Sequence, residues 1–278
     1  MKAIIHEQFG SAEVLKLADV PKPTPKANEL LIQVAAAGVN RADILQRKGH
    51  YPPPEGSSAI LGLEIAGDVV EIGPNVDNYK IGDRVFGLVE GGGYAEFCIL
   101  NESLAMPIPN TYDYVTAAAI PETFFTANET LFELGNLKPY ESVLIHAGGS
   151  GVGITAIQMA KYVNAEIYVT AGSSEKIKKC EAIGAKEGFN YKTDDYLSEI
   201  LKQTNQTGVD VIEDFLGGEY FNKNLACLKS GGRLIVVAFM NGAKVEIDLS
   251  LILRKRLQIK GSVLRTRTLK DKKIIKER

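Results

Sequence analysis

The chain has 278 residues, of which 45% are hydrophobic and 24% are charged, and its formal net charge is −2. This composition is ordinary for a soluble globular protein, and the length favours two domains. The small net charge gives no electrostatic reason to expect nucleic acid or an anionic membrane as a partner. The sequence shows no membrane-spanning run, no signal-peptide pattern and only three scattered cysteines. These features indicate a cytoplasmic protein with reduced thiols, without a disulfide framework or a zinc cluster.

The first 120 residues are predicted to be mostly β. Three strand-like runs bounded by turns lie at Leu30–Ala36, Ile65–Ile72 and Tyr94–Leu100. Prolines between positions 21 and 25 favour an extended edge over a regular element. We therefore expect a first domain over residues 1–120.

From residue 121 onward, helices and strands alternate. Helices are predicted at Pro121–Leu134, Glu175–Ile183, Tyr196–Gln203, Tyr220–Leu228 and Leu249–Leu253, with a further helix after the glycine string described below. Strands are predicted at Ser142–His146, Ile167–Thr170, Gly188–Tyr191, Val209–Phe215, Arg233–Phe239 and Leu257–Val263. Six strands separated by helices imply an α/β domain over residues 121–263 with a doubly wound parallel sheet, whose ligand lies at the carboxyl ends of the strands.

The stretch Glu141–Tyr162, ESVLIHAGGSGVGITAIQMAKY, predicts a strand, a glycine turn and a helix. Because Gly151 and Gly153 lack a β-carbon, a diphosphate can approach the backbone and the helix can pack close to the strand. The free N–H groups at the start of the helix, around Ser150 and Val152, point at the anion. The stretch therefore predicts a dinucleotide site, in preference to a glycine loop without a ligand.

The end of the second strand of this domain indicates which dinucleotide binds. NAD-specific folds place an acidic residue there, whereas this chain has Gly172 and Ser173, with Lys176 just beyond and Tyr191 at the end of the neighbouring strand. Hydroxyl and ammonium groups suit a 2′-phosphate, so the pattern favours NADPH. The alternative is that Ser173 only caps the helix and Lys176 is a solvated lysine.

Several motifs together resemble a known family. AGVNRADILQRKGHYPPP, ILGLEIAG, IGDRV, HAGGSGVG, AIQMAK, TAGS and GSVLRTR look like the zeta-crystallin-like quinone oxidoreductases of the medium-chain dehydrogenase/reductase superfamily. AAAIPETFFTA and KEGFNYK are similar to the group in that family named for induction by a tumour-suppressor protein. The resemblance runs from Met1 to about Thr268, and it implies a GroES-like catalytic domain, a Rossmann cofactor domain and NADPH-dependent reduction of quinones.

The sequence departs from the zinc-dependent alcohol dehydrogenases of the same superfamily at two places. Those enzymes carry a Cys-x-x-Asp pair and a Gly-His-Glu motif, whose Cys and His bind zinc. Here Asn40 and Leu63 stand at the matching positions, and neither is a usual zinc ligand. We therefore expect no metal, which excludes alcohol oxidation by the zinc mechanism and leaves hydride transfer to an electron-poor quinone or enone.

The resemblance also assigns residues around the nicotinamide. It places Asn40 and Tyr51 there as catalytic candidates, Asn40 also as a cofactor contact, and Thr126 as a further cofactor contact. Fold geometry adds Gly217 and Phe239, which are predicted to end the fourth and fifth strands. The alternatives are a Tyr51 ring packed on Pro52–Pro54 and a Thr126 hydroxyl bonded to its own helix.

Two of the three histidines lie near predicted functional segments. His50 lies next to Tyr51 in the sequence and could relay a proton, whereas His146 ends the first strand of the cofactor domain and is predicted to be a satisfied packing residue. The charged residues near the C-terminus are predicted to be solvated, because no aromatic residues are interleaved with them to make an RNA site.

The favoured function is therefore NADPH-dependent reduction of quinones by hydride transfer. An enoyl or alkenal reductase needs the same hydride and the same absence of zinc, so it stays open. A non-catalytic NADPH-binding or RNA-associated protein, as some relatives are, is the alternative from a different class.

The end of the chain carries two further expectations. Leu257–Val263 is the last strand of an open sheet, and the resemblance implies that two such edges meet in a homodimer. Relatives continue for several dozen residues that return to the first domain, so residues 264–278 are expected to be an incomplete return. We expect the Rossmann half to fold, and the short chain alone to be a weak reductase prone to aggregation.

Overall fold

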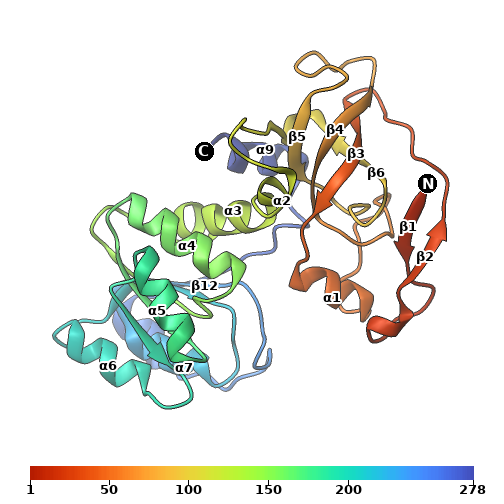
Figure 1. The fold of residues 1–278 in the computed structure, drawn as a ribbon. Coiled ribbons are helices and arrows are strands. Elements are labelled where there is room, and N and C mark those ends of the chain that lie inside the picture. Colours follow the sequence, from red (N-terminus) through yellow and green to blue (C-terminus); the bar gives the residue numbers. More distant parts are fainter. The chain divides into compact units, whose positions relative to one another are not determined.

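The computed structural model describes residues 1–278. The chain divides into two compact units (Figure 1). The first unit comprises Met1–Glu122 and Arg265–Glu277, and the second comprises Thr123–Leu264 with Arg278.

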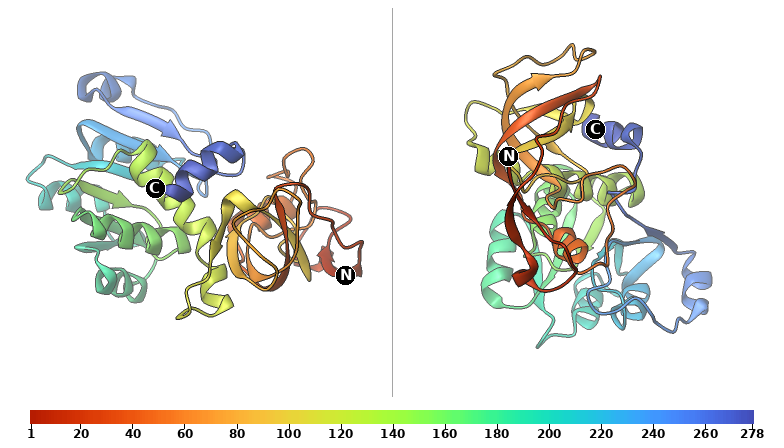
Figure 2. Two further views of the ribbon diagram at one scale, coloured as in Figure 1. Left: turned by 90° about the horizontal axis from the view of Figure 1, so that it is seen from above. Right: turned by 90° about the vertical axis from the view of Figure 1, so that its right-hand side faces the viewer.

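The first unit is built around a five-stranded antiparallel sheet with the strand order β6-β3-β4-β5-β7, which curls into a barrel-like shape (Figure 2). Its strands are β3 (Glu29–Ala37), β4 (Glu64–Ile72), β5 (Arg84–Leu88), β6 (Phe97–Asn101) and β7 (Ala105–Pro107), and a separate hairpin pairs β1 (Lys2–Ile5) with β2 (Lys16–Asp19). The predicted strands in this region are confirmed, except that the third begins at Phe97 instead of Tyr94.

Short helices complete the first unit. They are α1 (Arg41–Arg47), α2 (Tyr114–Ala118) and α9 (Leu269–Glu277), with 3-10 turns η1 (Ala12–Val14) and η2 (Glu102–Leu104). Helix α9 packs against η2 and buries Lys272 and Ile275. The hydrophobic pattern predicts neither α1 nor α9, because each is short and its orientation depends on contacts far away in the sequence.

The second unit is an α/β domain whose six-stranded sheet has the strand order β10-β9-β8-β11-β12-β13, and all of its pairs are parallel. Its strands are β8 (Ser142–Ile145), β9 (Glu166–Ala171), β10 (Glu187–Asn190), β11 (Val209–Asp214), β12 (Leu228–Val236) and β13 (Gln258–Gly261). Alternate strand residues enter opposite apolar clusters, as Val143 and Leu144 do. The predicted doubly wound sheet is confirmed.

Helices cover both faces of this sheet, as the two apolar clusters require. They are α3 (Pro121–Asn128), which continues as the π-helical segment η3 (Glu129–Leu134), then α4 (Gly151–Tyr162), α5 (Ser174–Ile183), α6 (Tyr196–Gln203), α7 (Tyr220–Cys227) and α8 (Leu249–Lys255). The predicted helices are confirmed to within a few residues. None of the helices in the structure is long and apolar enough to span a lipid bilayer.

The prediction for the fifth strand of the second unit is wrong in position. Strand β12 begins at Leu228 and ends at Val236, three residues before Phe239. The N–H of Val237 still donates to the carbonyl oxygen of Asp214 at 2.8 Å, and beyond Val237 the chain enters a loop. Strand β13 is likewise shorter than the predicted Leu257–Val263.

Candidate cofactor site and active-site residues

The turn between β8 and α4 carries the glycine string that is predicted to hold a diphosphate. Ser150 caps α4, since its Oγ accepts the N–H of Gly153 at 3.0 Å. A β-carbon on Gly148 would lie 2.8 Å from the Cβ of Val169, and one on Gly153 would lie 2.6 Å from the carbonyl oxygen of Ala147. These two glycines are therefore required for the close packing of turn, strand and helix.

The outer end of the same turn is open. Ser150 and Gly151 are exposed and Val152 is half-buried. A β-carbon on Gly151 would meet only the Cγ2 of Thr123, at 3.2 Å. The first turn of a helix has N–H groups without helical acceptors, and the helix dipole is positive there. The geometry therefore suits an anion at the start of α4.

The residues predicted to hold a 2′-phosphate lie around the end of β9. A β-carbon on Gly149, in the glycine turn, would lie 3.1 Å from the Cδ of Lys176, so this lysine lies against the turn. A β-carbon on Gly172 would lie 2.5 Å from the hydroxyl oxygen of Tyr191, which follows β10 by one residue. The structure therefore brings an ammonium and a phenol to one end of the sheet.

Ser173 and Glu175 lie near Lys176 in the sequence, at the start of α5. The Oγ of Ser173 accepts the N–H of Lys176 at 3.4 Å, so Ser173 caps α5, as the alternative interpretation expects. The carboxylate of Glu175 accepts a hydrogen bond from Lys179 at 2.8 Å. Lys176 is exposed, and no ion pair joins it to a carboxylate.

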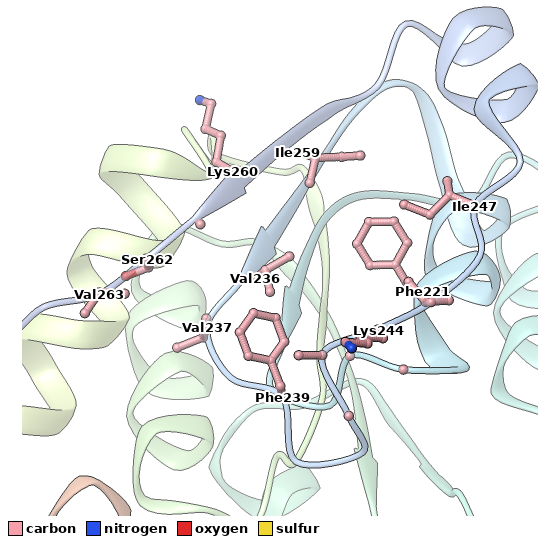
Figure 3. A pocket seen from close by; sticks show the side chains of 16 residues that line it. Phe221, Val236, Val237, Phe239, Lys244, Ile247, Ile259, Lys260, Ser262 and Val263 are labelled. Carbon is pink, nitrogen blue, oxygen red and sulfur yellow. The ribbon is translucent and has the colours of Figure 1, made fainter. Parts of the chain in front are cut away.

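Gly217 and Phe239 lie in loops, three residues beyond β11 and β12 respectively, and the prediction that they end these strands is wrong. Gly217 has a φ of +63°, which favours glycine, and its N–H donates to the Oδ1 of Asp214 at 3.0 Å. Both residues line a cavity of about 560 Å³ beside the ends of β12 and β13, into which Phe221 and Phe239 direct their rings (Figure 3). They therefore lie at the ligand end of the sheet, although not on its strands.

Thr126 is buried in α3. Its carbonyl oxygen accepts the hydroxyl of Thr130 at 2.8 Å, and that hydroxyl is also hydrogen-bonded to Glu213. The assignment of Thr126 as a cofactor contact stays a prediction.

Asn40 stands at the start of α1 and is tied to buried carboxylates of the first unit. Its side-chain amide donates to the Oε1 of Glu64 at 2.8 Å, and its backbone N–H donates to Asp43 at 2.8 Å. The other carboxylate oxygen of Glu64 accepts the N–H of Glu122 at 2.9 Å. Burial raises the pKa of Glu64. Asn40 is therefore held in place through a carboxylate 24 residues further along the chain.

Tyr51 lies beside Arg265, which the C-terminal part of the first unit supplies. The guanidinium carbon is 5.3 Å from the centre of the Tyr51 ring, and the guanidinium donates to the Tyr51 carbonyl oxygen at 3.3 Å. Burial, followed by the charge of Glu122, raises the pKa of the Tyr51 phenol. Tyr51 therefore keeps its proton at neutral pH and can donate it in a hydrogen bond.

Of the two histidines considered, His146 is the packing residue that the sequence predicts. It is fully buried, with its Nδ1 2.9 Å from the Thr170 hydroxyl and its Nε2 2.8 Å from the Asn224 Oδ1. Burial lowers its pKa. His50 is exposed, and its role as a proton relay stays a prediction.

Family models match both parts of the chain. Residues 26–110 match the alcohol dehydrogenase GroES-like domain, and residues 151–275 match the zinc-binding dehydrogenase model. A quinone oxidoreductase from Homo sapiens is 35% identical over 95% of this chain and 80% of its own length, and one from Lama guanicoe is 36% identical with the same coverage.

A solved Escherichia coli quinone oxidoreductase in complex with NADPH has a TM-score of 0.89 at 28% identity, covering 100% of this chain and 86% of its own. The enoyl reductase of CurK has a TM-score of 0.89 at 30% identity, covering 99% and 86% of the two chains. The chain belongs to the quinone oxidoreductase family of the medium-chain dehydrogenase/reductase superfamily. It is therefore an oxidoreductase, and NADPH is the cofactor of its family.

At the two positions where zinc-dependent members of the superfamily have zinc ligands, this chain has Asn40 and Leu63. Leu63 is 2% exposed and belongs to the apolar core, and the Asn40 amide is engaged by Glu64. The chain contains no group of three or more His, Cys, Asp or Glu side chains placed to hold a metal ion, and its cysteines are free and buried. The donor set present does not suit zinc.

The sequence pattern did not predict two residues that lie beside Tyr51, namely Glu122 and Arg265. Glu122 is half-buried next to Glu64 and Asp43, and burial together with these carboxylates raises its pKa to about 8. Arg265 is 6% exposed and donates to the Glu90 carbonyl oxygen at 2.8 Å. The resemblance includes both residues in its motifs, but only the contacts across the fold indicate that they surround Tyr51.

Proposed function

We propose that this chain reduces quinones with NADPH, without a metal. The observation that carries the proposal is the pairing of Asn40 with Glu64 where zinc enzymes have a ligand, together with the apolar Leu63. The cofactor, when bound, supplies the hydride, and an electron-poor ring needs no Lewis acid to accept it. The named quinone oxidoreductase relatives support quinone as the acceptor.

Residues of this chain would bind and orient the cofactor and the quinone. The start of α4 would bind the diphosphate, and Ser173, Lys176 and Tyr191 would bind the 2′-phosphate. In the first unit, the Tyr51 phenol and the second amide hydrogen of Asn40 would donate hydrogen bonds to the acceptor oxygen, which becomes more negative as hydride arrives. The quinone would gain one hydride from the cofactor and one proton from solvent to become a hydroquinone.

Steady-state NADPH consumption with an ortho-quinone, compared with an enone, tests the proposal. We expect a higher kcat/KM for the quinone. A preference for the enone would support the second candidate, an enoyl or alkenal reductase, which the likeness to the CurK enoyl reductase favours. The chain has no tryptophan, so binding without turnover is followed by the fluorescence of the nicotinamide. Saturable binding with no oxidation of NADPH by either acceptor would indicate a non-catalytic protein.

Replacing Tyr51 with Phe is expected to lower kcat/KM for the quinone about ten-fold, because one hydrogen bond to the acceptor is lost. The Kd for NADPH should stay within about two-fold of the wild-type value, because the Tyr51 hydroxyl is not one of the groups proposed to bind the phosphates of the cofactor. Tyr112→Phe, at an exposed position of the first unit, is the control. An unchanged kcat/KM in Tyr51→Phe would remove Tyr51 from the mechanism.

Zinc is expected to be neither bound nor required. Elemental analysis of the purified protein should find far less than one zinc per chain, and prolonged treatment with a chelator should leave quinone reduction unchanged. Stoichiometric zinc, or loss of activity that added zinc restores, would contradict the proposal.

A homodimer joined through the second unit is also proposed. Strand β13 is the edge of the sheet. Ile259 within this strand is 39% exposed, and Val263, two residues beyond its end, is 49% exposed. Pairing of two such edges across a two-fold axis would cover them. Light scattering at micromolar concentration should give twice the mass of the chain, and a monomeric mass would count against this pairing. We place the enzyme in the cytoplasm, which the free, buried cysteines support.

A further inference from the structure

The first unit contains a cavity of about 500 Å³ that none of the predicted site residues lines. Its walls come from the segment after β1, from α1 with the loop that follows it, and from Ala59. The lining residues are His6, Glu7, Gln8, Phe9, Gln46, Gly49, Pro52, Pro53 and Ala59. This volume is in the range of pockets that bind small molecules.

Gln46 lines this cavity and carries an unused hydrogen-bond acceptor. The side chain is 3% exposed, and its Nε2 donates to the carbonyl oxygen of Ala59 at 3.1 Å. If the Gln46 amide were rotated by 180°, its oxygen would face the carbonyl oxygen of Ala59, and two acceptors would meet. The Oε1 is therefore the atom that faces away from Ala59. That Oε1 is buried and has no hydrogen-bond partner. A buried amide oxygen without a donor is unfavourable, and a ligand with a donor would satisfy it.

His6 contributes a second unused polar atom. Its Nε2 is also buried and has no partner. A neutral imidazole nitrogen can donate or accept a hydrogen bond, depending on the tautomer. The cavity therefore has one group that only accepts and one that adapts to the ligand.

The rest of the lining is mostly apolar and includes flat rings. The Phe9 ring lies 6.1 Å from the His6 ring and over Gly49, on which a β-carbon would lie 2.8 Å from the ring. Phe9 is 68% exposed, so the cavity is open to solvent beside this ring. Together with Pro52 and Pro53, the ring offers surfaces on which an aromatic molecule can pack.

We propose that this cavity is a second small-molecule site, which takes a neutral aromatic ring with a hydroxyl group. The hydroxyl would donate to Gln46 Oε1 and the ring would pack between Phe9 and the prolines. A neutral ligand is preferred because the Gln46 amide carries no charge, and because the one carboxylate of the lining, Glu7, is exposed and paired with Lys16 at 3.2 Å. This site does not depend on the proposed quinone reductase activity.

The test uses a fluorescent reporter. Because the chain has no tryptophan, Phe9→Trp places a single one at the cavity. The full-length variant is titrated with 4-methylphenol and with 4-methylanisole, which differ in whether the oxygen can donate. We expect saturable changes in emission and about ten-fold tighter binding of the phenol, the value of one good hydrogen bond.

Gln46→Leu in the same reporter background should bring the two affinities to within about two-fold. Gln158→Leu is the matched control, because Gln158 also donates to a backbone carbonyl, that of Ile154 at 3.2 Å, but lies in the second unit. Cooperative thermal unfolding at a temperature close to that of the reporter protein shows that each variant is folded. The inference is overturned if emission does not saturate, if both ligands bind equally to the reporter protein, or if the preference survives in Gln46→Leu.

Discussion

Replacing Glu213 with Gln is expected to remove a large part of the stability loss that the protein undergoes between pH 5 and pH 8, so that the variant is more stable than wild type at pH 8. Glu213 is fully buried in β11, and its carboxyl is hydrogen-bonded to Thr130 through one oxygen only. Burial raises the pKa of Glu213 to about 8. The folded protein therefore holds this carboxyl neutral at pH 7, and a neutral carboxyl can donate to the Thr130 hydroxyl while that hydroxyl donates to Thr126.

The sign of this pH effect follows from the protonation of Glu213 in the folded and in the unfolded chain. Below about pH 4.5 the carboxyl is protonated in both the folded and the unfolded chain, so its full contribution to stability is present. As pH rises toward 8, only the unfolded chain releases the proton, and the free energy of unfolding falls. One pKa unit corresponds to about 1.4 kcal/mol, so the wild-type protein should lose a few kcal/mol across this range.

Thermal and denaturant unfolding at pH 5, 6, 7 and 8 measures the effect. Glu213→Gln should be similar to wild type at pH 5 and more stable at pH 8, because an amide cannot ionise. Glu181→Gln, at an exposed position of α5, is the control and should follow the wild-type pH dependence. Parallel pH profiles for wild type and Glu213→Gln would show that Glu213 is ionised in the folded protein.

Replacing Lys176 with Ala is expected to weaken NADPH binding about ten-fold or more and to leave NADH binding unchanged. The lysine lies against Gly149 of the glycine turn, in the same region as Ser173 and Tyr191, and no carboxylate pairs with it. A charge-assisted hydrogen bond to a phosphate is worth more than a neutral one, and each 1.4 kcal/mol is about a ten-fold change in Kd. NADH has no 2′-phosphate, so it cannot lose this contact.

Titration of both cofactors by nicotinamide fluorescence gives the two Kd values. Lys178→Ala is the matched control, since Lys178 is an exposed lysine of the same helix two residues away and therefore on another face. High salt should reduce the difference between NADPH and NADH, because the contact is exposed. Equal affinities of the wild-type protein for the two cofactors would contradict the assignment of NADPH.

Local features of the sequence determined the second unit and its anion site. The strand β8, the glycine turn and α4 occupy about twenty consecutive residues, and Ser150 caps a helix that begins one residue later. Hydrophobic alternation and helix caps depend on neighbours in the chain, so they can be interpreted without the fold. The substitutions Asn40 and Leu63 likewise showed that the zinc ligands of related enzymes are missing.

Only the tertiary structure decided what surrounds those residues. Arg265 contacts Tyr51 across 214 positions, Glu122 donates to Glu64 across 58, and Gln46 meets Ala59 in a cavity for which the sequence gives no signal. The end of β12 was also misplaced, since the strand ends at Val236, where its pairing with Asp214 of the neighbouring strand ends. Such contacts depend on sheet register and on segments that return from far along the chain, and a burial-driven pKa such as that of Glu213 arises only once these segments have excluded water.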